Sequence, residues 1–275
     1  MLNTLAPLSV VRGIATPSIS TGACLAVLVL GLSACASQES VQVSQDSASI
    51  VRLADSLRER GQLATAIAFY QKAAAQSDSA GDLIVLGQAL AEAGAYERAS
   101  DAFRRALVRE PGHPDALLGY GTSLLALGDI DKSIQFLEQL VNEGSGTDTK
   151  RYSALGAALD SAGRHDQAVA AYTAGLDIRP DDLDLKTNLA LSYVFNDRHV
   201  EAINLMIEVT NTLEARPVHH RNHVLVLALA GQESQALATG IRMIGDRETQ
   251  DVMAQAATLR QLSTGADRAR ALGVS

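Results

Sequence analysis

Three histidines near residue 220 resemble a set of metal ligands, in residue type and spacing, more than any other group in the sequence. His219 and His223 stand four residues apart, so on a helix their imidazoles would project from one face, close to His220. No glutamate directly follows His219, and both cysteines of the chain lie within the first 35 residues. The alternative is a helix that begins at Pro217 and carries partly exposed histidines near its start. We therefore expect no metal site.

An acidic run, Asp181, Asp182 and Asp184, could offer oxygen ligands to a cation. A calcium loop needs more oxygen ligands than this run supplies, together with a glycine in register. The run follows Pro180 and precedes an apolar periodic segment, where acidic side chains favour the positive end of a helix. It indicates the start of a helix.

Other spacings that are typical of catalysis do not occur. The sequence contains no G-x-S-x-G, H-E-x-x-H or C-x-x-C motif, and no glycine-rich phosphate loop follows a strand pattern. The formal net charge is −8, aromatic residues make up 4% and tryptophan is absent, so a basic, base-stacking surface for nucleic acid is not expected. We predict a protein that is not an enzyme and needs no cofactor.

The first 34 residues have the composition of an export signal. They contain one basic residue, Arg12, and no lysine, aspartate or glutamate; an apolar run over residues 24–32 is followed by the small Ser33 and Ala34. A basic start, a short apolar region and a small-residue end are typical of a secretory signal peptide. The run is shorter than the ~20 residues that span a bilayer. An uncleaved N-terminal anchor is the alternative.

The residues LSAC at 32–35, which span the end of this segment and the cysteine after it, resemble a bacterial lipobox. The resemblance implies cleavage after residue 34 and attachment of a diacylglyceryl group to the thiol of Cys35, whose acyl chains would anchor the protein. Ala36 follows the cysteine where aspartate would imply inner-membrane retention, so the periplasmic face of the outer membrane is expected. Residues 35–46 would then be a lipid-bearing flexible tether. An ordinary signal with a chance cysteine is the alternative.

A repeat with steps of 33 to 35 residues governs the rest of the sequence. One column holds residues that tolerate the left-handed conformation at a helix end: Gly61, Gly94, Gly128, Gly163, Asp197 and Gly231. Four residues earlier stand large side chains: Leu57, Leu90, Leu124, Leu159, Tyr193 and Leu227. Five residues later stand small ones: Ala66, Ala99, Ser133, Ala168, Ala202 and Ala236. Four residues further on, Gly240 breaks an otherwise apolar column: Tyr70, Phe103, Leu137, Tyr172, Met206 and Gly240.

Each repeat is predicted to be an apolar periodic helix, a tight turn at the glycine column and a second such helix. The six units cover residues 47–79, 80–113, 114–148, 149–182, 183–216 and 217–250. Residues 47–250 are therefore expected to form an all-α solenoid. Within residues 251–275, Val252, Ala256 and Leu259 keep helical spacing and predict a capping helix. After Ser263 we expect a mobile tail.

The columns resemble the tetratricopeptide repeat, whose pattern is Leu-Gly-x-x-Tyr, then Ala-x-x-x-Phe, then Pro. The copy with Leu86, Gly87, Ala99, Phe103 and Pro111 follows it best, although the tryptophan frequent in the family is absent throughout. The resemblance implies a solenoid whose first helices line a concave, protein-binding groove.

The groove positions of that family fall on residues of the first helices of units 2 to 6. They are Ile84, Gln88, Leu118, Thr122, Leu125, Ala157, Asp160, Leu191, Val194, Phe195, Arg221, Leu225 and Leu229. This largely apolar set suits an amphipathic helix or an extended apolar peptide. The alternative for each residue is a place in the core between units.

The stretch RNHVLVLALAG, from Arg221 to Gly231, is similar to the final repeat of TadD-type lipoproteins of the tight-adherence (Flp) pilus assembly system. The later segment that ends at Arg260 with ATLR looks like their closing helix. The resemblance implies a binding protein that helps the outer-membrane secretin or other pilus components to assemble or localise. The alternative is a general envelope adaptor for peptidoglycan enzymes or outer-membrane protein assembly.

Overall fold

The computed structural model describes residues 46–143 and 148–273. The predicted signal peptide, the lipidation site at Cys35 and all but the last residue of the predicted tether lie outside the described residues. Every regular element in the described part is an α-helix, so the predicted all-α class is confirmed. None of these helices combines the length and apolar character that crossing a bilayer requires.

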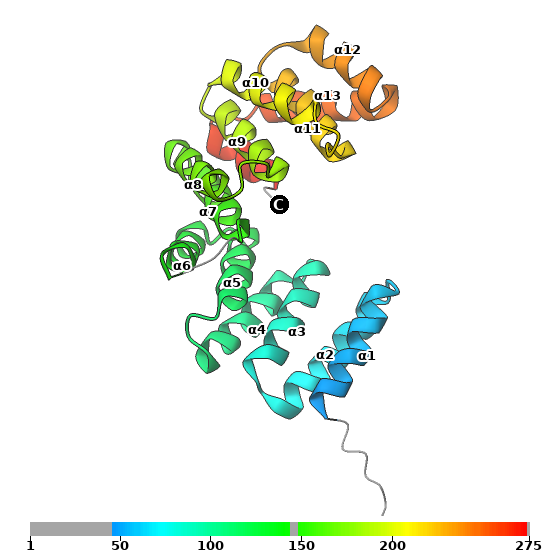
Figure 1. Cartoon of the computed structure of the whole chain (residues 1–275), viewed down its shortest axis with the longest axis vertical. Helices are drawn as coiled ribbons and strands as arrows, with labels where there is room; N and C mark the ends of the chain where they lie inside the picture. Colours follow the sequence, from blue (N-terminus) through cyan, green and yellow to red (C-terminus); the bar gives the residue numbers. More distant parts are fainter. Residues whose placement is uncertain (1–45, 144–147, 274–275) are drawn as a thin grey trace, which may run out of the picture. The chain divides into compact units, whose positions relative to one another are not determined.

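In the part of the chain that the structure describes, six consecutive helix pairs are followed by two further helices (Figure 1). Units 1 to 3 comprise α1 (Ser47–Glu59) and α2 (Leu63–Ser77), α3 (Ala80–Glu92) and α4 (Tyr96–Arg109), and α5 (Pro114–Ala126) and α6 (Ile130–Glu143). Units 4 to 6 comprise α7 (Lys150–Ser161) and α8 (His165–Ile178), α9 (Leu183–Phe195) and α10 (His199–Thr210), and α11 (Pro217–Leu229) and α12 (Glu233–Met243). The last two helices are α13 (Asp246–Arg260) and α14 (Gly265–Leu272). The first helix of each unit begins at the predicted start of that unit or one residue later.

The turn within each pair is made by the glycine column. All six of its residues have a positive φ, between 55° at Asp197 and 81° at Gly128. The turn is closed by the following residue, as where the Ala95 N–H donates to the Leu90 carbonyl at 2.9 Å. This bond satisfies a carbonyl that the end of the first helix would otherwise leave unpaired.

Replacing Gly94 by alanine is expected to lower the free energy of unfolding by about 1–2 kcal/mol, because a Cβ strains the left-handed conformation. Its φ is +71° and a Cβ there would meet no atom within 4 Å, so the cost is one of backbone conformation alone. Gly81 is the matched control, because its Cβ position is equally open and its φ is ordinary. Urea denaturation followed by circular dichroism measures both, and equal stabilities of the two variants would contradict the turn assignment.

The small and large columns form the core. All six small residues are fully buried, and the large ones from Tyr70 to Met206 are at most 1% exposed. The Phe103 ring presses against helix backbones on both sides: a Cβ at Gly87 would lie 2.8 Å from the ring, and one at Gly119 only 2.3 Å. The glycines of the first helices therefore allow the large residue of a second helix to wedge between neighbouring units.

Gly240, the exception in the large column, has a packing reason. A Cβ at this position would lie 2.5 Å from the side chain of Thr249, which is fully buried on α13. The space that a large residue fills in the other units is occupied here by the next helix.

Neighbouring first helices contact one another in order, from α3 through α5, α7 and α9 to α11. Among the described residues, successive second helices do not make comparable contacts. The first helices therefore form the inner side of the stack, as expected for a solenoid of helix pairs. We call the surface formed by α3, α5, α7, α9 and α11 the first-helix face.

The C-terminal helices complete the structure in two ways. α13 packs on α11 and buries Val252, Ala256 and Leu259, the residues whose spacing predicted a cap. The prediction of a mobile tail after Ser263 is wrong, because α14 forms there and packs on α7 and α9. Thr264 caps this helix by accepting from the Asp267 N–H at 3.0 Å, a local signal that the sequence prediction overlooked.

Candidate protein-binding site

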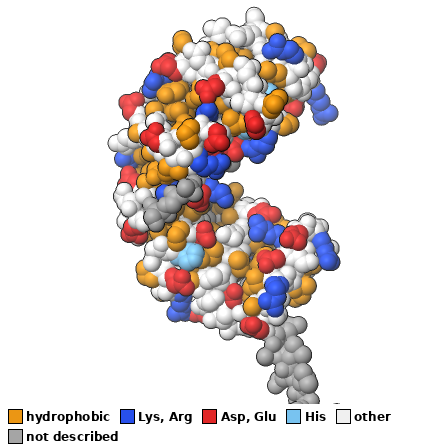
Figure 2. Space-filling view, viewed as in Figure 1, with side chains coloured by type: hydrophobic (Ala, Val, Ile, Leu, Met, Phe, Trp, Pro, Cys, Tyr) orange, Lys and Arg blue, Asp and Glu red, His pale blue; other side chains and the backbone are white. Residues whose placement is uncertain are grey.

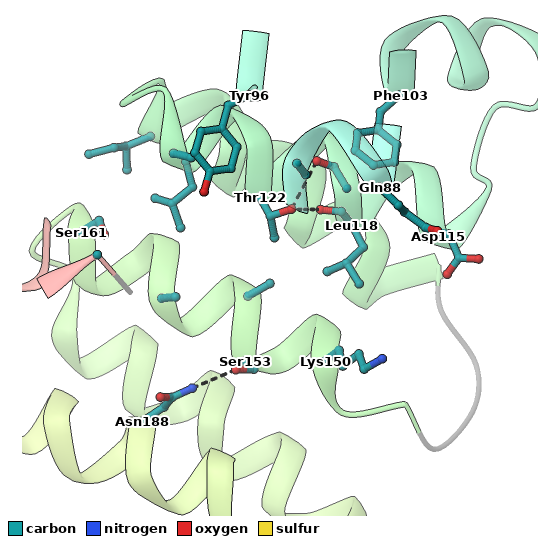
Figure 3. A pocket seen from close by; sticks show the side chains of 18 of the residues that line it. Gln88, Tyr96, Phe103, Asp115, Leu118, Thr122, Lys150, Ser153, Ser161 and Asn188 are labelled. Carbon is teal, nitrogen blue, oxygen red and sulfur yellow. Dashed lines mark hydrogen bonds between the residues drawn. The ribbon is translucent and has the colours of Figure 1, made fainter. Parts of the chain in front are cut away.

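A cavity of about 890 Å³ opens on the first-helix face at units 2 to 4. Five of the predicted groove residues line it together, namely Gln88 of α3, Leu118, Thr122 and Leu125 of α5, and Ala157 of α7. In Figure 3, Leu118 and Thr122 project from α5 toward the opposite wall that α7 provides. The family groove positions of units 2 to 4 thus meet at one cavity, with the exceptions given below.

The cavity combines an apolar surface with a few polar groups. Thr122 Oγ1 donates to the Leu118 carbonyl at 2.8 Å, and Asn188 Nδ2 donates to Ser153 Oγ at 2.9 Å (Figure 3). Charges of both signs stand among the lining residues, at Asp115 and Lys150. Figure 2 likewise shows acidic and basic side chains interspersed with hydrophobic ones on the face in view. Such a surface offers apolar contact and hydrogen bonds to a peptide.

Sequence reasoning missed the polar side of the cavity. Lys150, Ser153, Ala154 and Ser161 line it from α7, together with Asn188 from α9. The signal was present, because positions 150, 154, 157 and 161 recur at helical spacing and fall on one face of α7.

Several other predicted groove residues are corrected by the structure, because they are buried in the core. These residues are Ile84, Asp160, Leu191, Val194, Phe195, Leu225 and Leu229. The physical reason at units 5 and 6 is that α14 packs on α9 and α13 packs on α11. Arg221 is also engaged, since its Nη2 donates to Gln255 Oε1 of α13 at 2.6 Å. The open part of the predicted groove is therefore restricted to units 2 to 4.

Asp160 is the centre of a buried polar network. Its carboxylate accepts hydrogen bonds from His165 Nδ1 at 2.7 Å, Ser192 Oγ at 2.9 Å and the Tyr172 hydroxyl at 3.3 Å. Burial raises the pKa of Asp160 and that of Tyr172. The network joins α7, α8 and α9, and its role is to hold units 4 and 5 together.

Two of the three histidines considered for metal binding, His219 and His223, have different hydrogen-bond partners. His219 Nδ1 accepts from the Arg216 N–H at 3.0 Å, while its Nε2 lies 3.0 Å from Asp184 Oδ1. His223 Nδ1 lies 3.0 Å from Thr210 Oγ1. Within residues 46–143 and 148–273, no three histidine, cysteine or acidic side chains are placed to share a metal ion.

The acidic run has the role that its position predicted. Asp182 accepts from the Leu185 N–H at 3.1 Å and so caps the start of α9. Carboxylates at this end of a helix satisfy free N–H groups and complement the helix dipole.

His223 should make the protein less stable in acid. Burial, with positive charge at His220 and Arg242, lowers the pKa of His223 to about 4. Its Nε2 is buried without a hydrogen-bond partner, so a proton added there would have no acceptor. Below about pH 6.5 the unfolded chain takes up this proton, whereas the folded chain does not until the pH nears 4. The free energy of unfolding is therefore at its full value above about pH 6.5 and falls by about 3 kcal/mol in total as the pH falls toward 4.

Urea denaturation at several pH values between about 7 and 4, which bracket the ordinary histidine pKa, tests this prediction, with His223→Asn as the comparison. The asparagine cannot take up the proton, so the variant should lose clearly less stability than the wild type across this window. Parallel pH profiles of the two proteins would contradict the assignment.

The helix pairs, the turn column and the open inner face define a class of protein, the helical-repeat scaffolds that bind other proteins. Tetratricopeptide-repeat models match residues 48–79, 90–159 and 149–182. The described helices form a tetratricopeptide-repeat solenoid. A comparison with curated proteins gives no match.

Solved structures share this fold at low sequence identity. PilW, described as a widely conserved type IV pilus biogenesis factor, is 16% identical over 76% of this chain and 99% of its own, with a TM-score of 0.66. The pilF protein of Pseudomonas aeruginosa is 16% identical over 77% of this chain and 98% of its own, with a TM-score of 0.60. MamA from Desulfovibrio magneticus RS-1 is 23% identical over 60% of this chain and 93% of its own, with a TM-score of 0.54. These similarities show a shared fold.

Proposed function

We propose that this protein is a non-enzymatic scaffold that binds components of an Flp pilus assembly system, above all the outer-membrane secretin. The cavity between α5 and α7 is the observation that carries the proposal, because it presents apolar and hydrogen-bonding side chains on the inner face of a tetratricopeptide-repeat solenoid. A groove of this kind binds a helix or an extended segment of another protein. The proposed mechanism is binding, with no chemical step.

Three further observations support the choice of partner and place. The stretch 221–231 is similar to the final repeat of TadD-type lipoproteins, and PilW, which has the same fold, is described as a pilus biogenesis factor. The residues LSAC at 32–35 resemble a lipobox, so we propose anchoring through Cys35 at the periplasmic face of the outer membrane.

Deletion of the gene in its own host tests the function. We expect a loss of secretin multimers from the outer membrane and a loss of Flp pili, with both restored by the wild-type gene. A Cys35→Ser variant should be released from the outer-membrane fraction, because no acyl chain can be attached. Unchanged secretin and pili, with altered peptidoglycan cross-linking or outer-membrane protein levels, would contradict the pilus role and favour a general envelope adaptor.

A further inference from the structure

The C-terminal helix α14 lies on the first-helix face directly beside the binding cavity. It packs on α7 and α9, and Arg270 Nη1 donates to the Ser161 carbonyl at the end of α7. Arg270 and Gly273 also form part of the cavity lining. A segment of this chain therefore covers the part of the inner face that continues from the cavity toward unit 5.

The contact at the start of α14 is very close. A Cβ at Gly265 would lie 2.3 Å from the Phe195 carbonyl oxygen and 2.5 Å from His165 Nε2. The φ of Gly265 lies outside the left-handed region, so the backbone itself would accept alanine. Glycine is needed at this position because α14 and α9 approach each other closely, and its backbone conformation does not require it. Any larger residue must push α14 away from α9.

The rest of the attachment is small. Of the eight residues of α14, Ala269 alone is buried; it joins the core of units 5 and 6, against which the partly buried Leu272 also packs. Helices shorter than about 12–15 residues are marginal by themselves, so α14 depends on this docking for its structure. Short elements with few buried contacts open most easily, which makes α14 the part of the inner face best suited to move.

We propose that α14 is a displaceable intramolecular ligand of the first-helix face, which competes with the partner for the surface next to the cavity. The proposal rests on the proposed function, in that the partner is a protein segment bound at this face. It specifies the partner chemistry: a helix with a stripe of small apolar residues, like Ala266 and Ala269, and a basic residue placed like Arg270. Such a basic group suits the negative C-terminal end of α7. When α14 leaves, the binding surface extends from unit 4 onto α9.

Binding of a free peptide tests this inference without any pilus component. The probe is a fluorescently labelled peptide of residues 261–275, added to the full chain and followed by anisotropy. The tethered α14 outcompetes the free peptide because its effective concentration is high. A Gly265→Ala chain releases its own α14 and should bind the peptide at least tenfold more tightly than the wild type. A peptide that itself carries Gly265→Ala should bind neither chain.

Two controls keep the result interpretable. Gly81→Ala makes the same substitution where a Cβ meets no atom within 4 Å, and this chain should bind the peptide like the wild type. Arg270→Gln removes the bond to the Ser161 carbonyl and provides a second way to weaken docking if Gly265→Ala fails to fold. Hydrogen exchange should show loss of protection in α14 of both docking variants, with α3 to α6 unchanged.

Equal peptide binding by the wild type and the docking variants, including no binding by either, would overturn the inference. Retained protection of α14 in folded Gly265→Ala would overturn it as well. Either result would leave the secretin proposal standing, because no secretin takes part in the experiment. Conversely, if deletion of the gene left secretin multimers and pili unchanged, the result of the peptide experiment would be unaffected.

Discussion

Replacement of Phe103 by alanine is expected to lower the free energy of unfolding by about 3–5 kcal/mol. The ring is 1% exposed and is wedged between α3 and α5, where Gly87 and Gly119 bring the two helix backbones against it. The truncated side chain would leave a cavity between units 2 and 3 that these rigid helices cannot close. Urea denaturation followed by circular dichroism measures the loss.

The matched control is Val108→Ala on the same helix. Val108 is 67% exposed, so its truncation should change the stability by no more than about 0.5 kcal/mol. If the two alanine variants were equally stable, the assignment of the large column to the contact between units would be contradicted.

The double variant Leu118→Glu with Leu125→Glu should weaken binding of the secretin at least 100-fold, which corresponds to about 2.7 kcal/mol. Both leucines are only partly buried, and both line the cavity from α5. A bound partner would cover the two new carboxylates without neutralising them, and burying unpaired charge is unfavourable. Titration of the purified full chain with purified secretin measures the effect, and circular dichroism verifies the fold.

Val108→Glu with Val200→Glu is the matched control for this variant. Both valines are about two-thirds exposed, on the second helices α4 and α10, and neither lines the cavity. This double variant adds the same charge away from the first-helix face, so binding should be retained. Full binding by the Leu118→Glu, Leu125→Glu variant would contradict the location of the site.

The repeat architecture could be predicted from the sequence because each of its determinants is local. A left-handed turn residue, a small residue five positions later and a large one four positions further on specify one helix pair, and six copies repeat the signal. Even Asp197, the non-glycine member of the turn column, has the expected positive φ. Gly240 was visible as an exception, but its reason, the approach of Thr249, required the structure.

The candidate site could be predicted only in part, because burial on the first-helix face depends on contacts between distant residues. Leu125 and Asp160 each lie three residues before the turn glycine of their unit, yet Leu125 lines a cavity and Asp160 is enclosed by His165, Tyr172 and Ser192. The covering of unit 5 by α14 was missed because its short, charged sequence has no helical pattern strong enough to predict docking.

Site-specific photo-crosslinking in the native envelope tests most directly whether the first-helix face binds the partner. A photoreactive residue would replace Thr122, which is exposed on α5 and lines the cavity, or Val200, which is 68% exposed on α10. We predict an adduct with the secretin or another pilus-assembly protein from position 122 and none from position 200. An adduct from position 200 with none from position 122 would contradict binding at the first-helix face.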